Sequence, residues 1–194
     1  MRVVTARALV RPMVVAVTPA VRLLLGMFYD RRLMSGIHFD GSLVGYRRMF
    51  TALWKQKILG FNRRCPWPLA PSSIVSDYSR IHFDPDDLAN FMSPGCYFQN
   101  FSADIYIGAG TLIAPNVGII TANHMIGSLG EHAPGENVVI GEGCWLGMNS
   151  VILPGVVLGP RTIVGAGSVV TKSFESGDCV IAGNPARILR TNVN

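Results

Sequence analysis

A six-residue spacing of aliphatic residues is the feature that most constrains the fold of this chain. The pattern runs from residue 107 to residue 170, at Ile107, Ile113, Ile119, Ile140, Leu146, Ile152, Leu158, Val164 and Val170. A period of six fits neither an α-helix, at about 3.6 residues per turn, nor a strand that alternates about every two residues. It is typical of a parallel β-helix, in which each hexad forms one flat face and one corner. We therefore predict an all-β repeat fold whose aliphatic column points into a narrow core.

Two further columns accompany the aliphatic positions. Glycine follows the aliphatic residue directly at Gly108, Gly141, Gly147, Gly159 and Gly165. A small or β-branched residue stands four positions after it, at Thr111, Val117, Cys144, Ser150, Val156, Thr162 and Ser168. The glycine permits the corner, and the small residue fits beside the stacked aliphatic side chains. With about eighteen residues in a three-faced coil, the region should hold roughly three and a half to four coils that begin near Tyr97.

The register of the repeat is interrupted once. The spacing between Ile119 and Ile140 is not a multiple of six, so a loop must leave the coil there, and this loop holds His124 and His132. Phe101 lies six residues before Ile107 and is expected to extend the register backwards by one hexad.

The first third of the chain is strongly basic. Residues 1–64 contain 12 Lys or Arg and only two acidic residues, whereas the remaining residues carry 5 basic and 10 acidic groups. This asymmetry indicates that the first third meets an anionic surface. The apolar run Met13–Ala20 is bracketed by Pro12 and Pro19 and is too short to span a bilayer. We therefore expect neither a membrane span nor a cleaved signal peptide there.

Two basic amphipathic regions are expected in this first third. Residues 5–29 should form one or two helices, and residues 44–59 a further helix that Gly60 ends. The proline-rich segment Cys65–Ser73 should be an extended connector, with Trp67 docked as its anchor. The apolar stripe of these helices fits a packing arm and an interfacial membrane anchor equally well.

Short capping elements are expected at both ends of the repeat. The run Asp84–Asp87 could hold a metal or act in catalysis, but an N-cap at Asp84 with Pro85 as first helical residue favours a short helix at 85–92. By the same logic, Asn184 and Pro185 should begin a short helical element at 186–190. We accordingly divide the chain into an N-terminal extension, residues 1–94, and a β-helix domain, residues 95–194.

The repeat region resembles a known enzyme family. The segments IITANH (Ile119–His124), VVIGEGCWLGMNSVILPGVVLG, VGAGSVVTK and IAGNPARILR occur in this order. In order and spacing they resemble the hexapeptide-repeat acyltransferases, which include galactoside, maltose and serine acetyltransferases and polysaccharide O-acetyltransferases. The resemblance covers about residues 95–190, whereas residues 1–90 contain no matching motif. It implies a left-handed parallel β-helix, a homotrimer and acetyl-CoA as the acyl donor.

His124 is the candidate catalytic residue. Transfer of an acyl group from a thioester to a hydroxyl needs a base, and a neutral imidazole suits that task. In the family that this chain resembles, a histidine at the end of this hexad has that role. No Ser, Cys or Lys stands in a nucleophile motif, so direct transfer is expected rather than a covalent enzyme intermediate. A solvated corner histidine is the alternative.

Four further residues are candidates for binding the acceptor: Asn100, Asn123, Trp145 and His132. The resemblance implies that Asn100, in YFQNF, helps to bind the acceptor and that Trp145 borders the active-site tunnel. Asn123 could instead be a corner residue in the left-handed conformation. For His132 the alternative is a solvated loop residue, and for Trp145 a surface residue at a subunit contact.

The resemblance also implies a set of coenzyme A contacts. These are Gly147, Met148, Ala166, Thr171 and Lys172 along the coils, with Arg187 and Arg190 at the phosphates of the coenzyme. The planar fork of arginine suits phosphate oxygens. Small sugar acetyltransferases often have serine where this chain has Met148.

Together these observations predict an O-acetyltransferase that moves an acetyl group from acetyl-CoA to a sugar hydroxyl of a surface-polysaccharide or glycolipid precursor. The alternatives are N-acetylation of an amino-sugar nucleotide and a non-catalytic β-helix scaffold. A zinc enzyme on the same helix needs three histidines, but only His124 and His132 fall in the coil region, so no metal is expected. No nucleic-acid partner is expected either.

The location follows from the basic extension and the cysteines. The four cysteines show no CxxC spacing and are expected to be reduced, as in a cytoplasmic protein. Residues 1–60 are expected to contact the inner face of the cytoplasmic membrane. The alternatives for this extension are that it caps the coil or stabilises the trimer.

Overall fold

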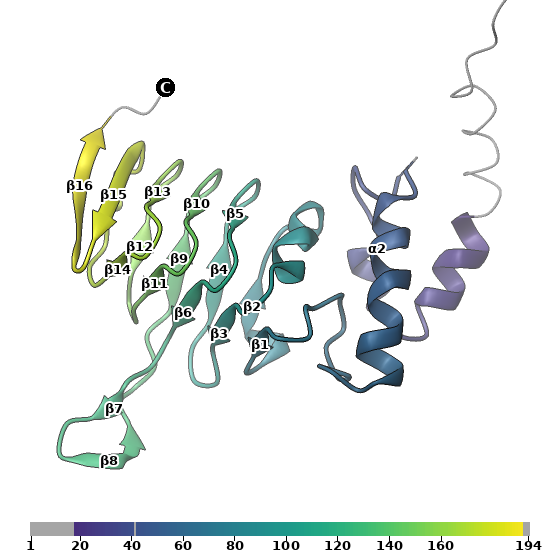
Figure 1. Ribbon diagram of the computed structural model, residues 1–194, viewed down its shortest axis with the longest axis horizontal. Coiled ribbons are helices and arrows are strands. Elements are labelled where there is room, and N and C mark those ends of the chain that lie inside the picture. Colours follow the sequence, from purple (N-terminus) through teal and green to yellow (C-terminus); the bar gives the residue numbers. More distant parts are fainter. Residues whose placement is uncertain (1–17, 41, 192–194) are drawn as a thin grey trace, which may run out of the picture. The chain divides into compact units, whose positions relative to one another are not determined.

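The computed structural model describes residues 18–40 and 42–191 (Figure 1). The chain forms two compact units, Met1–Pro71 and Ser72–Asn194. The second unit contains the repeats.

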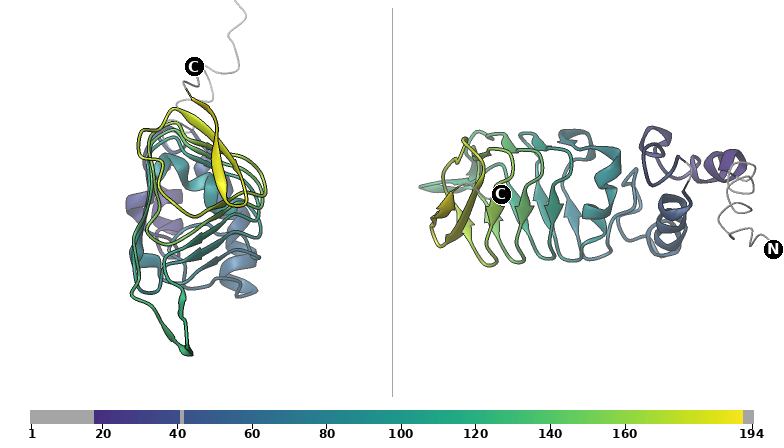
Figure 2. Two further views of the ribbon diagram at one scale, coloured as in Figure 1. Left: turned by 90° about the vertical axis from the view of Figure 1, so that its left-hand side faces the viewer. Right: turned by 90° about the horizontal axis from the view of Figure 1, so that it is seen from above.

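The repeat unit is a left-handed parallel β-helix with three faces, as the periodicity and the resemblance predict (Figures 1 and 2). Face A consists of β1 (Ile74–Val75), β3 (Tyr97–Gln99), β6 (Gly118–Ile120), β11 (Val151–Ile152) and β14 (Val169–Val170). Face B consists of β2 (Ile81–His82), β4 (Ile105–Ile107), β9 (Val138–Ile140) and β12 (Val157–Leu158). Face C consists of β5 (Leu112–Ile113), β10 (Trp145–Leu146), β13 (Ile163–Val164), β15 (Cys179–Gly183) and β16 (Ala186–Thr191).

The core of the β-helix is the predicted aliphatic column. Every aliphatic residue of the six-residue pattern is buried, and so is every member of the small-residue column four positions later. Thr111 shows why a small polar residue suits that column, since its hydroxyl donates to the carbonyl of Gly141 at 2.8 Å and accepts from the amide of Cys144 at 3.1 Å. The small side chain therefore links neighbouring coils without enlarging the core.

The corners use glycine for two separate reasons. The third residue after the aliphatic position has positive φ in seven of the nine hexads: Gly110, Asn116, Gly143, Asn149, Gly155, Arg161 and Gly167. The glycine that directly follows the aliphatic residue is needed for space instead. At Gly159 an added Cβ would lie under 3.0 Å from backbone atoms of Glu175 and Gly177 in the next coil. Close stacking of backbones, rather than an unusual φ, requires glycine at this position.

The first coil starts earlier than the sequence pattern indicates. Strand β1 pairs in parallel with β3, matching Ile74 to Tyr97, so the coil begins about one turn before the expected start near Tyr97 and ahead of the 94/95 boundary. Face A accordingly has five strands, more than the predicted three and a half to four coils. Phe98 is the fully buried residue of β3, whereas Phe101 is 41% exposed, so the prediction that Phe101 extends the register is wrong.

In this first coil a 3₁₀ helix replaces the strand of face C. After the single turn η3 (Tyr78–Arg80), helix η4 (Pro85–Met92) is capped by Asp84, whose side chain accepts from the amide of Asp86, which confirms the predicted cap. Two side chains of η4 bond to the backbone before and within β5. Asp87 accepts from Gly110 N at 2.7 Å, and Asn90 donates to Thr111 O at 2.7 Å and accepts from Ile113 N at 3.0 Å. Side chains thus take the place of a neighbouring strand.

The C-terminal element is a strand and not the helix predicted at 186–190. Strand β16 pairs antiparallel with β15, with Gly183 opposite Ala186, and the Asn184–Pro185 peptide bond in the turn between them is cis. Asn184 and Pro185 therefore form a tight hairpin turn, and residues 186–191 continue face C because β15 offers them hydrogen-bonding partners. The signature of an N-cap followed by proline is shared by helix starts and by such turns.

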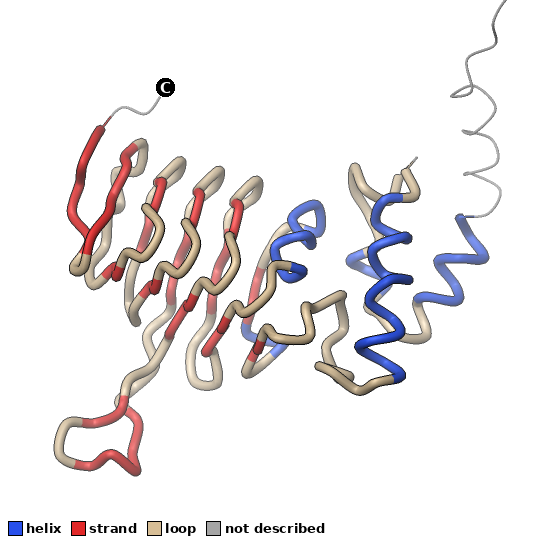
Figure 3. The backbone as a smooth tube through the Cα atoms, in the orientation of Figure 1, coloured by secondary structure: helices blue, strands red, loops and turns tan. Residues whose placement is uncertain are grey.

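The first unit is mainly helical in its described part (Figure 3). A helix covers residues 18–25, followed by η1 (Arg31–Leu33), α2 (Val44–Leu53) and the π-helix η2 (Trp54–Ile58). The helix predicted at 44–59 is confirmed, and Gly60 follows it with φ of +92°. Of the region predicted helical at 5–29, residues 5–17 lie outside the described residues. Among the described residues, no helix combines the length and the apolar character needed to cross a membrane.

A buried glutamine organises the core of the first unit. Gln56 is 1% exposed, and its amide nitrogen donates to Trp67 O at 2.8 Å and to Asn62 O and Cys65 O at 3.2 Å. Its amide oxygen accepts from the hydroxyl of Tyr29 at 3.3 Å. The proline-rich segment is thereby tied to η2, and Trp67, 3% exposed, is the docked anchor that we expected.

Candidate active site

The predicted loop leaves the corner between faces A and B as a hairpin (Figure 1). Its strands are β7 (His124–Met125) and β8 (Ser128–His132), which pair antiparallel. Two backbone bonds close its base: Ala133 N donates to Asn123 O at 2.8 Å, and Glu136 N donates to Thr121 O at 2.8 Å. His124 therefore stands at the junction between the regular coil and the projecting hairpin.

Pairing within the hairpin brings the two predicted histidines together. His124 lies opposite His132, and their ring centroids are 4.4 Å apart with an interplanar angle of 34°. Phe101 contacts His132 edge-on, with the two ring centroids 4.8 Å apart. Both imidazoles are exposed, and within the described part of the chain the ring of His124 makes no hydrogen bond. A catalytic base is usually oriented by a further group, and no described residue has that contact with the ring of His124.

Gln99 positions the backbone that leads to His124, and the sequence analysis missed it. Its amide oxygen accepts from Thr121 N and Ala122 N, both at 3.0 Å, and its amide nitrogen donates to Ala122 O at 3.0 Å. The side chain is nearly buried. These bonds span 22 and 23 residues along the chain, and a single sequence gives no signal of such pairing.

Asn100 has a structural role that does not agree with the predicted contact to an acceptor. It is fully buried, its amide oxygen accepts from Asp77 N at 2.9 Å, and its amide nitrogen donates to Asp77 O at 2.7 Å. A side chain with no exposed surface and with both amide groups engaged cannot reach an acceptor in this conformation. Asn100 instead joins the first coil to the second.

Asn123 remains available to a ligand, and the alternative proposed for it is wrong. It is exposed, and its φ does not fall in the left-handed region, which the described asparagines Asn62, Asn116 and Asn149 occupy. Its backbone closes the base of the hairpin, so its side chain lies next to His124 in the chain and is free to meet solvent or substrate.

Trp145 lies on the outer surface of face C, away from the hairpin corner in the same chain. It is 52% exposed and stands in register with Leu112 on one side and Ile163 on the other. Ile163 is in turn opposite Val180, and Val180 is opposite Arg190. An outward apolar row thus runs along face C and ends at an arginine.

The predicted coenzyme contacts fall on two different corners of one chain. Thr171 and Lys172 follow β14, at the same corner between faces A and B from which the hairpin of His124 leaves. Met148 and Ala166 lie at the corner between faces C and A, on adjacent coils joined by the bond from Gly167 N to Met148 O at 2.8 Å. Gly147 at that corner is buried, so it can offer only space and backbone. A single chain does not bring the two groups together.

The two predicted phosphate-binding arginines lie on β16. Arg187 and Arg190 are exposed, and neither makes an ion pair with another described residue. Arg187 donates one bond to Ala186 O at 2.9 Å. Lys172, by contrast, rests over the ring of Phe174 with its ammonium 5.7 Å from the centroid. The exposed cations are thus divided between face C, which holds Arg187 and Arg190, and the corner between faces A and B, which holds Lys172.

The cysteines do not have the properties of nucleophiles. All four are free and buried. Burial raises the pKa of the Cys96 and Cys144 thiols, and it raises the pKa of Cys65 to about 12. A thiol must ionise in order to attack, so these side chains agree with direct transfer.

A third histidine, His82, also lies in the coils, but it does not complete a metal site. His82, which we placed outside the coils, lies in β2 and stacks on Tyr106 with centroids 4.6 Å apart. Within the described ranges, no three His, Cys, Asp or Glu side chains are arranged to hold a metal ion.

Comparison with known proteins points to one family. Residues 137–172 match the model of the bacterial transferase hexapeptide, with six repeats. The galactoside O-acetyltransferase of Escherichia coli K12 is 35% identical over 107 residues, covering 48% of this chain and 50% of that protein. The provisionally named colanic acid biosynthesis acetyltransferase WcaF of the same organism is 38% identical over 90 residues, covering 46% and 49%. The chain spans about half the length of these relatives.

A solved galactoside acetyltransferase in complex with coenzyme A has the same fold. The TM-score is 0.55 with 24% identity, and the match covers 92% of this chain and 83% of that chain. At this level of identity the comparison supports the left-handed β-helix and not a particular substrate.

Proposed function

We propose that this chain, whose coils belong to the family of bacterial transferase hexapeptide repeats, transfers an acetyl group from acetyl-CoA to a hydroxyl group of a sugar. The observation that carries the proposal is the position of His124 at the foot of a hairpin. The side chain of Gln99 holds the preceding residues Thr121 and Ala122, and a backbone bond from Ala133 to Asn123 closes the base. The relatives named galactoside O-acetyltransferase and colanic acid biosynthesis acetyltransferase support this activity.

The reaction needs one proton to be moved. The acceptor oxygen attacks the thioester carbonyl while the imidazole of His124 takes the hydroxyl proton. The C–S bond then breaks, and the imidazolium returns the proton to the departing thiolate of coenzyme A. The buried, raised-pKa thiols support this direct route, because no enzyme nucleophile needs to be acylated.

The division of the predicted contacts over two corners supports a site shared between subunits. A donor molecule that meets both Lys172 and Met148 must lie between two copies of the chain. A closed ring of three copies makes three equivalent sites, because each copy offers one corner of each kind. In this arrangement a neighbouring subunit can supply the group that orients His124, and Trp145, His132 and Asn123 are left to meet the acceptor.

The fit to coenzyme A rests on the exposed cations. Arg187, Arg190 and Lys172 are exposed and make no ion pair in the described residues, and phosphate oxygens are the ligands that such groups prefer. When bound, the coenzyme supplies the activated acetyl thioester.

The acceptor that we favour is a precursor of a surface polysaccharide or glycolipid, met at the inner face of the cytoplasmic membrane. The name of the WcaF relative supports a polysaccharide. The excess of Lys and Arg in residues 1–64 supports a contact with anionic lipid through residues 1–60.

The catalytic part of the proposal is tested by acetyl-CoA discharge against a panel of hydroxyl and amino sugars. His124→Ala should lower turnover by about 10²- to 10⁴-fold, the contribution of a positioned base, while coenzyme binding persists. The matched control is His82→Ala, an exposed histidine on face B, which should leave turnover unchanged. Turnover of His124→Ala within a few-fold of the parent would refute the assignment.

The shared site is tested by complementation. His124→Ala and Ala166→Trp alter different corners, and each should be inactive alone. When the two variants are co-expressed, random mixing leaves about a quarter of the interfaces with both corners intact, so activity should return to roughly that level. No recovery in mixed trimers, or an active monomer in light scattering, would exclude a site between subunits.

A further inference from the structure

The first unit exposes an unusual amount of apolar surface for its size. Twelve of the 24 exposed large hydrophobic side chains among the described residues lie between residues 23 and 61. They include Met27 at 65% exposure, Ile37 at 70% and Trp54 at 59%. Clustered apolar surface of this kind marks an interaction site, whereas single exposed residues need no explanation.

The pattern is clearest along α2 and η2. The buried side of this helix holds Gly45, Tyr46, Met49 and Gln56. On its exposed side Phe50, Trp54 and Ile58 follow one another at intervals of four residues. Four residues are close to one helical turn, so these side chains form a stripe. The helix is therefore apolar on the face turned away from its own core as well as toward it.

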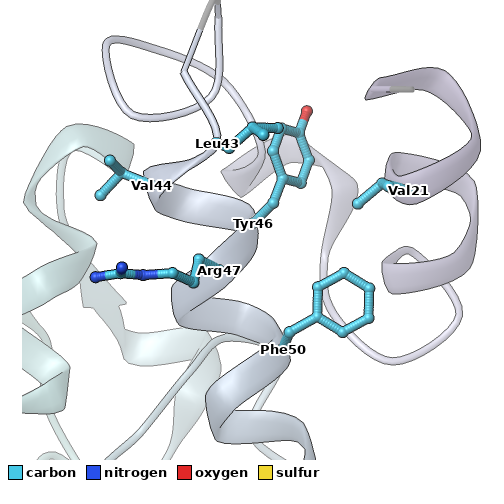
Figure 4. Close-up of a pocket in the computed structure, with 6 residues that line it drawn as sticks. All are labelled: Val21, Leu43, Val44, Tyr46, Arg47 and Phe50. Atoms are coloured by element: carbon cyan, nitrogen blue, oxygen red, sulfur yellow. The ribbon is translucent and has the colours of Figure 1, made fainter. Parts of the chain in front are cut away.

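The stripe begins at an apolar groove. A groove of about 530 Å³ is lined by Val21, Leu43, Val44, Tyr46, Arg47 and Phe50. Figure 4 shows Val21, Tyr46 and Phe50 gathered between the helix of residues 18–25 and α2, with Arg47 extending from another side of α2. The groove is thus built of hydrocarbon with one cation at its margin.

The first unit is also strongly basic. Residues 18–71 contain nine Arg or Lys and two acidic residues. Both carboxylates are engaged inside the unit, Asp30 with Arg32 at 2.7 Å and Asp40 with Gly36 N at 2.8 Å. Lys57 is turned inward, where its ammonium donates to Arg63 O and Cys65 O at 2.8 Å. The seven remaining basic side chains make no ion pair within the described residues: Arg22, Arg31, Arg47, Arg48, Lys55, Arg63 and Arg64. The described part of the unit therefore carries uncompensated positive charge.

We propose that the first unit is a docking module for an anionic membrane surface, with Phe50, Trp54 and Ile58 in the headgroup region and the groove receiving a hydrocarbon chain. The arginines and lysines bind the lipid phosphates at the same time. Apolar side chains interspersed with Arg and Lys are the chemistry of interfacial binding. This inference deepens the membrane contact of the proposed function and rests on that part of it, not on the acetyl-transfer chemistry.

Other occupants fit the face less well. A second copy would bring the same excess of positive charge against this surface, and like charges oppose such pairing. A nucleic acid would be attracted by the charge but would gain little from an aliphatic groove. The unit is also not required to cap the first coil, because η4, in the second unit, already bonds to β5 there and buries Phe91 against Phe98.

The experiment uses the full chain and vesicles of phosphatidylcholine with or without phosphatidylglycerol, at low and high salt. The parent should sediment with the anionic vesicles at low salt. The double variant Trp54→Ser with Ile58→Ser should reduce that partition by at least about 10-fold, because two exposed apolar anchors are removed. Arg47→Gln should reduce it about fivefold at low salt and less at high salt.

Two controls match these variants. Ile74→Ser removes a side chain of similar exposure, 55%, from the second unit, and Arg80→Gln removes a charge from that unit, and neither should change vesicle binding. Trp54→Phe keeps an apolar anchor. It should still bind, but it should lose the blue shift of tryptophan emission that vesicles cause in the parent, since Trp67 is buried and Trp145 lies in the β-helix.

The outcomes separate this inference from the proposed chemistry. Acetyl-CoA discharge measured on the same variants reports the active site, and unchanged discharge also shows that the variants fold. Absence of vesicle binding by the parent, equal binding by the double variant, or a blue shift that persists in Trp54→Phe would each overturn the docking face. Light scattering could also show that the double variant forms a smaller assembly than the parent while binding vesicles equally well. That result would assign the stripe to contacts between copies instead.

Discussion

The two units of this protein are held together by opposite strategies. In the β-helix, the same three columns recur from coil to coil, so each buried aliphatic residue has equivalents above and below it. In the first unit, one buried side chain, Gln56, bonds to the backbone at Asn62, Cys65 and Trp67. Repetition spreads stability over many positions, whereas a central polar residue concentrates it at one.

The largest effect on stability is expected where the repetition leaves no space. Gly159→Ala would place a methyl group against the backbone of Glu175 and Gly177, which cannot move without separating two coils. We expect a loss of about 3 kcal/mol in the free energy of unfolding, at the upper end of overpacking costs. Gly130→Ala is the control, since nothing lies within 4 Å of its added methyl group. Thermal unfolding of both variants measures the difference, and equal midpoints would contradict the close-stacking argument.

The next effect tests the central residue of the first unit. Gln56→Leu leaves the carbonyls of Asn62, Cys65 and Trp67 without their side-chain donor, which should cost about 2 kcal/mol. Because the β-helix does not contain these bonds, hydrogen exchange should rise in residues 18–71 and not in the coils. Lys55→Gln, on the exposed side of the same helix, is the matched control. Exchange that rises equally in both units would show that they do not unfold separately.

A smaller effect distinguishes the two asparagines beside the proposed site. Asn100→Ala removes a buried amide bonded to Asp77 and should lower the free energy of unfolding by about 1–2 kcal/mol. Asn123→Ala, exposed at the foot of the hairpin, should leave unfolding unchanged and instead raise KM for the acceptor. If the two variants exchanged these effects, the roles assigned here would be reversed.

The smallest effect concerns Arg161. Its φ is +54°, whereas the other positive-φ residues of its column are glycine or asparagine, and it forms an ion pair with Asp178. Arg161→Gly relieves the backbone but loses an exposed ion pair, so the two effects should nearly cancel. The Arg161 guanidinium lowers the pKa of Asp178. Any stabilisation by the pair is therefore fully present above the ordinary pKa of a free carboxyl. It is lost as the pH falls through the lowered pKa of Asp178. A melting point of the variant far from the parent at pH 7 would contradict this balance.

The sequence predicted the parts of the fold that depend on local repetition. The aliphatic and small-residue columns identified the coils because each position repeats the same side-chain requirement every six residues. The first coil was missed because neither Val75 nor Ile81, its buried aliphatic residues, is followed by a corner glycine, and because η4 replaces its third strand. The hairpin at the C-terminus was missed because a cap followed by proline suits a turn as well as a helix.

The candidate site was predictable only in part, for a related reason. His124 and His132 were both found from the interruption of the register, but their contact depends on the pairing of β7 with β8. The bonds of Gln99 to the strand that leads to His124, and of Asn100 to Asp77, join residues more than twenty positions apart. No local pattern reports such bonds, so Asn100 was assigned to an acceptor that it cannot reach.

The side chains of η4 also limit how the β-helix can grow. An open sheet edge can recruit a strand from another molecule and so start a fibre. On face C the amides of Gly110 and Ile113 and the carbonyl of Thr111 are already bonded to Asp87 and Asn90. A second β-helix therefore finds no free hydrogen-bonding groups at these positions with which to continue the face end to end. The helix that replaces one strand thus blocks the addition of a further strand to face C at this end.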